Sequence, residues 1–145
     1  MIQIQKTALV PYPNHDMFVL VNDIAGYPQF LPWCKSIIIH SQTDTDIIAT
    51  INMSGIGLGQ SFTTTNVIKP NEFIEMRLLK GPFKHLYGKW NFHQLGADGC
   101  KICLDLEFAI SNSLLRVSLE PIFTKISNNL VDAFVQQANK LYGKP

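Results

Sequence analysis

The sequence predicts an α+β domain in which a curved, seven-stranded antiparallel sheet surrounds a long C-terminal helix, with two short helices after the first strand. Three observations lead to this class. Apolar side chains recur at helical spacing over residues 112–142, six β-rich runs follow one another without a helix between them, and short helical segments follow the first strand. Consecutive strands without a crossover helix pair antiparallel. Because such a sheet twists and curls, the long helix is expected to fill its concave side.

The C-terminal helix is expected to span residues 112–142 and to bury one face. Serine and asparagine at 111–113 are N-cap candidates, and Gly143 is a stop signal after the last turn. Pro121 removes one backbone hydrogen bond, so we expect either a kink there or a short helix at 113–118 followed by a main helix. The expected buried face comprises Leu115, Leu119, Ile122, Phe123, Ile126, Leu130, Phe134, Ala138 and Leu141.

The N-terminal part is expected to hold one strand and two short helices. Residues 2–8 alternate apolar and polar side chains, which is the pattern of a half-buried strand. Two prolines end this strand, and a helix with Asn14 as its N-cap candidate follows as far as Asp23. Residues 24–31 can form a further turn or two, which two more prolines keep short. The apolar side of the first helix is formed by Met17, Phe18, Leu20 and Val21.

Six further strands are expected before the long helix. Glycine, proline, asparagine and aspartate residues separate them. In the last two strands the apolar residues alternate, so that Leu86, Trp90 and Phe92 share one face, as do the even-numbered residues of 102–110. The expected strands cover residues 36–41, 46–53, 60–69, 72–79, 86–92 and 102–110.

Composition indicates one domain covering residues 1–145. With 46% hydrophobic residues, the chain can bury roughly two-thirds of its unfolded surface without a metal or a disulfide. The net charge of +1 from 12 basic and 11 acidic residues, without a run of like charge, argues against DNA binding. No apolar stretch reaches the ~18 residues of a membrane span. The expectation is a cytoplasmic protein with at most transient membrane contact.

Candidate catalytic and metal-binding patterns are weak. Cys100 and Cys103 have CxxC spacing, but positions i and i+3 of a strand point to opposite faces, so we expect no redox pair. The four histidines are far apart in the sequence. Asp105 and Glu107 alternate with apolar neighbours and should point outward, whereas a catalytic carboxylate pair converges on a pocket. We therefore expect neither a metal site nor catalytic residues.

Three glycines, Gly55, Gly57 and Gly59, form a GxGxG string. Nucleotide-binding loops of this kind lie between a strand and the N-terminus of a helix. Here a β-rich run follows instead, so the string is interpreted as the tip of a hairpin.

Several segments together resemble a known family. They are YPQFLPWC at 27–34, GPF at 81–83, the alternating residues of 86–92 and LVDAFV at 130–135. Over residues 1–143 the chain resembles the coenzyme-Q-binding, START-like family. This resemblance implies a single START-like, polyketide-cyclase-like domain with the helix-grip (SRPBCC) fold, in which the sheet wraps around the C-terminal helix and encloses a cavity.

The resemblance also implies two activities. One is binding of ubiquinone or a related isoprenoid lipid in support of respiratory electron transport, with no other cofactor. The alternative is that of a ribosome association toxin, which binds the large ribosomal subunit and blocks subunit association. Polyketide cyclase-like catalysis uses the same fold elsewhere, but it requires polar groups converging in the cavity. We therefore expect a non-enzymatic lipid-binding protein, with ribosome binding as the alternative.

The candidate site residues come from facing apolar positions and from the family segments. Phe30 and Trp33 lie in a turn bracketed by prolines, where they either cap the core or form a binding platform. Lys35 beside them could pair with a polar head group or an RNA phosphate. The expected cavity lining comprises Phe30, Trp33, Phe62, Phe83, Leu86, Trp90, Phe92, Phe108, Phe123, Leu130 and Phe134. The expected partner surface comprises Lys35, Lys80, Lys84 and Lys89.

Overall fold

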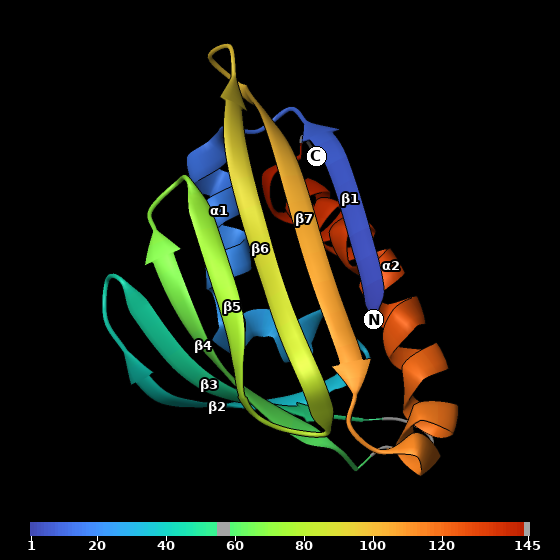
Figure 1. Cartoon of the computed structure of the whole chain (residues 1–145). Helices are drawn as coiled ribbons and strands as arrows, with labels where there is room; N and C mark the ends of the chain where they lie inside the picture. Colours follow the sequence, from blue (N-terminus) through green and yellow to red (C-terminus); the bar gives the residue numbers. More distant parts are fainter. Residues whose placement is uncertain (55–58, 144–145) are drawn as a thin grey trace.

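The computed structural model describes residues 1–54 and 59–143 and contains seven strands, two α-helices and one 3₁₀ helix within them (Figure 1). The order of elements is the one that the sequence predicts. In chain order they are β1 (Ile2–Val10), α1 (Asn14–Asn22), η1 (Ile24–Gln29), β2 (Cys34–Gln42), β3 (Asp46–Met53), β4 (Ser61–Lys69), β5 (Phe73–Lys80), β6 (Phe83–Leu95), β7 (Gly99–Ile110) and α2 (Ser113–Tyr142).

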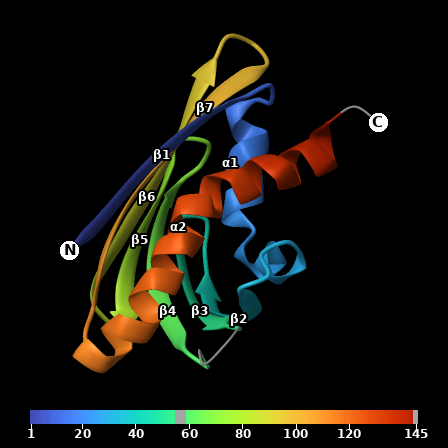
Figure 2. The same cartoon turned by 90° about the vertical axis from the view of Figure 1, so that its right-hand side faces the viewer.

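The strands form one antiparallel sheet in the order β1-β7-β6-β5-β4-β3-β2. Strands β2 to β7 therefore follow one another as a meander, and β1 joins the far side by pairing with β7. Figure 2 shows α2 crossing one face of the curved sheet obliquely. Side chains alternate along β6 and β7, so every second residue from Cys100 to Ile110 is buried. The predicted α+β fold with a curved sheet around the C-terminal helix is confirmed.

The helix α2 is capped at both predicted ends. The Asn112 Oδ1 atom accepts hydrogen bonds from the backbone N–H groups of Leu114 (2.8 Å) and Leu115 (3.4 Å). Gly143 ends the helix and donates its N–H to the carbonyl of Asn139 at 2.9 Å. Pro121 lies inside a continuous helix, so the expectation of two separate helices is wrong. One missing hydrogen bond at an exposed position does not break a helix whose next turns are buried against the sheet.

The buried face of α2 is rotated slightly from the predicted one. Its buried residues are Leu119, Phe123, Ser127, Val131, Phe134 and Ala138. Ser127 and Val131 are buried although the sequence pattern left them out, and the predicted core residue Leu141 is 55% exposed. At the end of the helix Tyr142 takes the place of Leu141, because its ring packs against Tyr12 with centroids 5.7 Å apart.

The two short N-terminal helices cover one end of the sheet. Helix α1 contacts β6, β7 and α2, and it buries Met17, Phe18, Leu20 and Val21 as predicted. The predicted cap Asn14 is instead the first residue of α1, because Pro13 occupies the N-cap position. The Asn14 Nδ2 atom donates to the carbonyl of Asn71 at 3.0 Å. The following segment is the 3₁₀ helix η1, which packs beside β2. None of the helices within residues 1–54 and 59–143 is both long and apolar enough to cross a membrane.

Candidate ligand-binding cavity

An apolar cavity of about 60 Å³ lies between the concave face of the sheet and α2. Five strands, the η1 segment and about three turns of α2 contribute to its wall. The lining is apolar except for the hydroxyl groups of Thr64 on the sheet, Ser127 on α2 and Tyr27 on η1. It comprises Tyr27, Trp33, Ile51, Phe62, Thr64, Met76, Leu86, Trp90, Leu106, Phe123, Ile126, Ser127, Leu130 and Phe134.

The structure brings most of the predicted lining residues together at this cavity, and it places four of them elsewhere. Phe30 packs edge-on against Phe134 with centroids 5.2 Å apart, so it caps the core rather than lining the cavity. Phe92 lies beside Trp90 and against Phe18 of α1. The other two, Phe83 and Phe108, belong to an aromatic cluster at the end of the cavity.

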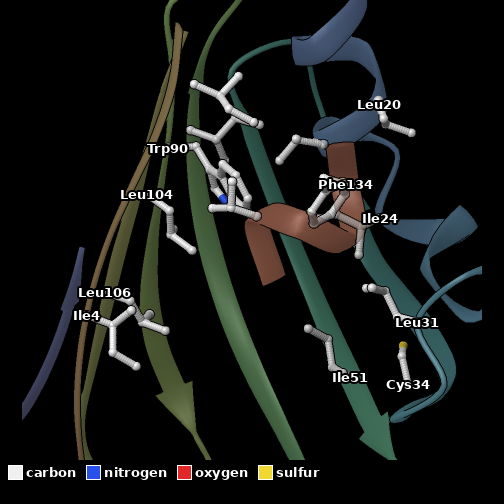
Figure 3. Packing of buried hydrophobic residues seen from close by; sticks show 14 of the residues in the cluster. Ile4, Leu20, Ile24, Leu31, Cys34, Ile51, Trp90, Leu104, Leu106 and Phe134 are labelled. Carbon is white, nitrogen blue, oxygen red and sulfur yellow. The ribbon is translucent and has the colours of Figure 1, made fainter. Parts of the chain in front are cut away.

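An aromatic contact between the sheet and α2 forms one wall of the cavity. Strand β6 directs the Trp90 indole toward the helix, where it meets Phe134 edge-on with ring centroids 5.2 Å apart (Figure 3). Tyr27 of η1 also packs against Phe134 at 5.3 Å. Alternation along β6 places Trp90 inward, and the spacing of α2 places Phe134 opposite it.

A second aromatic cluster closes the cavity at its other end. Phe123 of α2 contacts Phe83 at 4.9 Å, Phe108 at 4.8 Å and Phe62 at 6.1 Å between ring centroids. These four rings come from β4, β6, β7 and α2, and all four are buried. They fill the space that the sequence pattern assigned to a ligand, which explains why the enclosed volume is small.

The polar groups of the lining are already hydrogen-bonded to the protein. Ser127 Oγ donates to the Phe123 carbonyl at 2.8 Å, and Thr64 Oγ1 donates to Asn66 Oδ1 at 3.1 Å. The Tyr27 hydroxyl donates to the carbonyl of Val21. Burial raises the pKa of the Tyr27 hydroxyl above its ordinary value, so the group stays protonated at neutral pH. No acid or base of the described lining is therefore available for proton transfer.

An open groove of about 200 Å³ lies outside the cavity, between α2 and the loop before β2. Trp33, Ile126 and Leu130 line both the groove and the cavity, so these three half-buried side chains separate the two spaces. Lys125 and Asn129 of α2 supply the polar part of the groove. The sequence pattern identified Trp33 and Leu130 but did not single out Ile126 as a site residue.

Lining residues that the sequence analysis missed are mostly inward residues of the middle strands. Ile51, Met76 and Leu106 alternate with outward neighbours on β3, β5 and β7, so strand periodicity carries the signal that would have found them. Ser127 carries no such signal, since a serine interrupts the apolar pattern of α2.

The cysteines do not form a redox or metal site. Cys100 is buried on the inner face of β7, while Cys103 lies half-buried on the other face, as the CxxC spacing on a strand predicts. Burial raises the pKa of the Cys34 and Cys100 thiols to about 11. Within residues 1–54 and 59–143 no three histidine, cysteine or acidic side chains gather as metal ligands.

The convex face of the sheet carries the polar groups of β5, β6 and β7. The His85 Nε2 atom lies 2.9 Å from Glu107 Oε1. The Tyr87 hydroxyl donates to Glu75 at 2.7 Å, and this hydrogen bond is the main cause of the lowered pKa of Glu75. Asp105 and Glu107 line a shallow, open depression of about 470 Å³ on this face, so neither carboxylate points into the cavity.

The four predicted partner-surface lysines are not gathered in one place. Lys80 and Lys84 flank the turn between β5 and β6, and Lys89 lies further along β6, where its Nζ atom is 4.6 Å from the centre of the Phe73 ring. Lys35 belongs to β2, the edge strand on the other side of β3, β4 and β5. Of the GxGxG string, residues 55–58 lie outside the described part of the chain.

A curved antiparallel sheet that grips a C-terminal helix around an apolar cavity defines the START-like class of proteins with the helix-grip fold. The pattern of the family described as polyketide cyclase/dehydrase and lipid transport matches residues 10–135. The chain belongs to this family.

Two relatives match almost the whole chain. A protein of Pseudomonas aeruginosa named ribosome association toxin RatA is 45% identical over 140 residues, which is 97% of this chain and 97% of the relative. The mitochondrial coenzyme Q-binding protein COQ10 of Drosophila melanogaster is 27% identical over 145 residues, 97% of this chain and 60% of that protein.

Solved structures share the fold. The Zhui aromatase/cyclase from Streptomyces sp. R1128 superposes with a TM-score of 0.84 at 18% identity, covering 96% of this chain and 94% of that one. A START superfamily protein from Mycobacterium smegmatis gives a TM-score of 0.80 at 19% identity, with coverage of 96% and 98%. These likenesses concern the fold alone.

Proposed function

We propose that the protein is cytoplasmic and binds ubiquinone or a related isoprenoid lipid without converting it chemically. This binding would support respiratory electron transport. The observation that carries this proposal is the apolar cavity between the sheet and α2, which adjoins an outer groove with polar groups at Lys125 and Asn129. The apolar lining of the inner space suits an apolar chain, and Lys125 and Asn129 of the groove suit a polar head group. The name of the Drosophila relative, a coenzyme Q-binding protein, supports the same ligand class.

Binding requires that the cavity open. Sites for small organic ligands measure roughly 300–1,000 Å³, whereas the inner cavity holds about 60 Å³ and the outer groove about 200 Å³. Since Trp33, Ile126 and Leu130 separate the two spaces, rotation of these half-buried side chains would join them. We infer that an incoming ligand displaces this partition and then packs against Trp90 and Phe134 of the inner lining.

The chemistry of the lining supports a non-enzymatic role. The hydroxyl groups of Ser127, Thr64 and Tyr27 donate to protein acceptors, and the tyrosine stays protonated. General acid–base catalysis needs a group that exchanges protons near neutral pH within reach of the ligand. The described lining offers an apolar surface and satisfied hydroxyls, which suit binding better than cyclisation.

The two tryptophans allow a direct test. Trp90 lines the inner cavity and Trp33 is part of the partition, so a quinone bound across the two spaces should quench the fluorescence of both. The experiment is a fluorescence titration of the wild type, Trp33→Phe and Trp90→Phe with quinones of increasing tail length. Each buried CH₂ contributes about 0.8 kcal/mol, so one added isoprene unit should tighten binding about tenfold or more until the space is full.

Saturable quenching of the remaining Trp90 in the Trp33→Phe variant would support a ligand inside the grip. Equal affinity for all tail lengths, or quenching that never saturates, would contradict the proposal. Ubiquinone co-purification, measured by lipid extraction and mass spectrometry, provides a second readout that is independent of fluorescence.

A second candidate function is binding to the large ribosomal subunit, which would block subunit association. The observation that favours it is the name of the Pseudomonas relative, a ribosome association toxin that is 45% identical over 97% of this chain. The predicted contacts are Lys80, Lys84 and Lys89, together with Lys35, which strands β3 and β4 separate from the other three.

Charge reversal tests this second function. Lys80→Glu, Lys84→Glu and Lys89→Glu together should weaken co-sedimentation with large subunits and reduce its salt dependence, because phosphate contacts release counterions. Stability should change by less than about 0.5 kcal/mol at each of the exposed Lys80 and Lys84, and by more at the half-buried Lys89, whose contact with the Phe73 ring is lost. Lys101→Glu, at an exposed lysine of β7 outside the predicted partner surface, serves as the matched control. Unchanged binding in the triple variant would exclude this surface.

A further inference from the structure

The outward face of α2 changes character along the helix. On its first turns the exposed side chains include Leu114 and Val117, which are 82% and 79% exposed, followed by the exposed Pro121. Further along, the exposed face carries polar residues such as Lys125 and Asn128. The two most exposed aliphatic side chains of α2 therefore lie at its start, and the outer surface that follows is polar as far as Leu141 in the last turn. Packing against residues 1–54 and 59–143 does not explain these two side chains, because both are almost completely exposed to solvent.

Cationic side chains surround this exposed apolar turn. Ser111, just before α2, donates hydrogen bonds from its N–H and its hydroxyl to the Pro82 carbonyl, both at 3.1 Å. The start of α2 is thereby tied to the turn between β5 and β6, which Lys80 and Lys84 flank (Figure 1). Figure 2 shows the start of α2 beyond the edge of the sheet.

The local charge at this end is positive. Lys84 and Arg116 line one open depression of about 370 Å³, together with the carboxylate of Glu120. The ion pairs found in the described part of the chain are Lys69 with Glu72, Arg77 with Glu75 and His85 with Glu107. Lys80, Lys84 and Arg116 take part in none of these pairs, so their charges remain available to an external partner.

We propose that this end of the molecule, defined as Leu114, Val117, Lys80, Lys84 and Arg116 and called the basic apolar tip, docks on an anionic lipid surface. Aliphatic side chains enter the boundary between head groups and acyl chains, while flanking lysine and arginine residues pair with lipid phosphates. The tip supplies both parts. It docks the protein without spanning the bilayer, and this surface role goes beyond ligand binding in the cavity.

An RNA surface fits the tip less well than a lipid surface. RNA phosphates would use Lys80, Lys84 and Arg116 but would leave Leu114 and Val117 without a partner. A lipid surface uses the cations and the aliphatic side chains together. Replacing the aliphatic side chains should therefore weaken binding to lipid but not to RNA, whereas replacing the cations should weaken both.

The test is flotation of the purified full-length protein with vesicles of phosphatidylcholine alone and of phosphatidylcholine mixed with phosphatidylglycerol. One variant combines Leu114→Ser and Val117→Ser, and a second combines Lys80→Gln, Lys84→Gln and Arg116→Gln. A matched control combines Leu95→Ser with Lys101→Gln, an exposed aliphatic and an exposed cation at the opposite end of β6 and β7. Thermal unfolding confirms that each variant is folded.

The wild type and the control should float with anionic vesicles and not with neutral ones. The charge variant should lose about fivefold in affinity for each cation removed, and the aliphatic variant should keep only weak, salt-sensitive binding. Wild-type affinity in either tip variant would overturn the proposal. A second outcome would also overturn it: the wild type binds no vesicles but binds purified large ribosomal subunits. If the charge variant then loses ribosome binding and the aliphatic variant keeps it, the tip is assigned to RNA.

Discussion

The Phe134 ring stands edge-on to the Trp90 indole, with the two ring centroids 5.2 Å apart and the planes at 78°. This contact joins the middle of α2 to the centre of the sheet, and both residues are at most 2% exposed. It positions the helix over β6 and forms one wall of the cavity. The same pair therefore links the stability of the fold to the shape of the site.

Truncation of Phe134 should destabilise the protein strongly. Phe134 contacts the rings of Tyr27, Phe30 and Trp90, so Phe134→Ala removes buried area and leaves a cavity. We expect a loss of about 3–5 kcal/mol in the free energy of unfolding, measured by denaturant titration. Leu141→Ala is the matched control on the same helix, and because Leu141 is 55% exposed its loss should stay below about 0.5 kcal/mol. Equal losses in the two variants would contradict the observed orientation of α2.

Most of the fold could be predicted because periodicity reports which side chains point inward. Alternation in β6 and β7 and the three-to-four spacing in α2 each define a buried face without any knowledge of the partner element. The side chains buried in the last turn of α2 were harder to predict than its limits. Leu141 fits the helical pattern, but the helix has passed the sheet at that point, and Tyr142 packs against Tyr12 instead. Periodicity gives the direction of a side chain but not what lies in front of it.

The cavity could be predicted only in outline for the same reason. Phe83 and Phe108 point inward as expected, yet they meet Phe123 with ring centroids 4.9 and 4.8 Å apart and fill the space between them. Whether two inward side chains touch or leave a void depends on the curvature of the sheet and the height of the helix. Ser127 lines the cavity because it is small, and a serine in an apolar face has no distinctive pattern.

Filling the cavity should weaken ligand binding without a large loss of stability. Ser127 is 1% exposed and lines the space, so Ser127→Val replaces its hydroxyl with methyl groups that occupy part of it. Excluding one CH₂ of ligand corresponds to about a fourfold weaker affinity, measured by the quinone titration. Thr124→Val on the same helix does not line the cavity and should bind like the wild type. Unfolding free energy should change by less than about 1 kcal/mol, since a lost hydrogen bond is offset by apolar burial. Unchanged affinity in Ser127→Val would place the ligand elsewhere.

The turn between β5 and β6 should not tolerate a side chain at Gly81. Its φ is +153°, and a Cβ atom there would lie 2.7 Å from Phe62 Cβ and 3.2 Å from Phe62 Cα. We expect Gly81→Ala to cost about 2–4 kcal/mol in unfolding free energy, from backbone strain and overpacking together. Gly96→Ala is the control, because its φ is +62° but no atom lies within 4 Å, and it should cost only about 1–2 kcal/mol. Equal costs would mean that Phe62 moves freely.

The buried thiols should make the protein less stable at alkaline pH. Burial raises the pKa of Cys34 and Cys100 to about 11, whereas a thiol of the unfolded chain ionises near 8.5. Above pH ~8.5 the unfolded chain therefore binds fewer protons than the folded protein, and the free energy of unfolding falls with rising pH until the folded-state pKa is passed. The double variant Cys34→Ala/Cys100→Ala should show a smaller decrease in unfolding free energy with rising pH than the wild type, measured by urea titrations across this pH window. Some decline should remain in that double variant, because burial also raises the pKa of Tyr27. Cys103→Ala is the control at a half-buried thiol on the other face of β7 and should keep most of the decline. A wild-type slope in the double variant would mean that both thiols ionise in the folded protein as readily as in the unfolded chain.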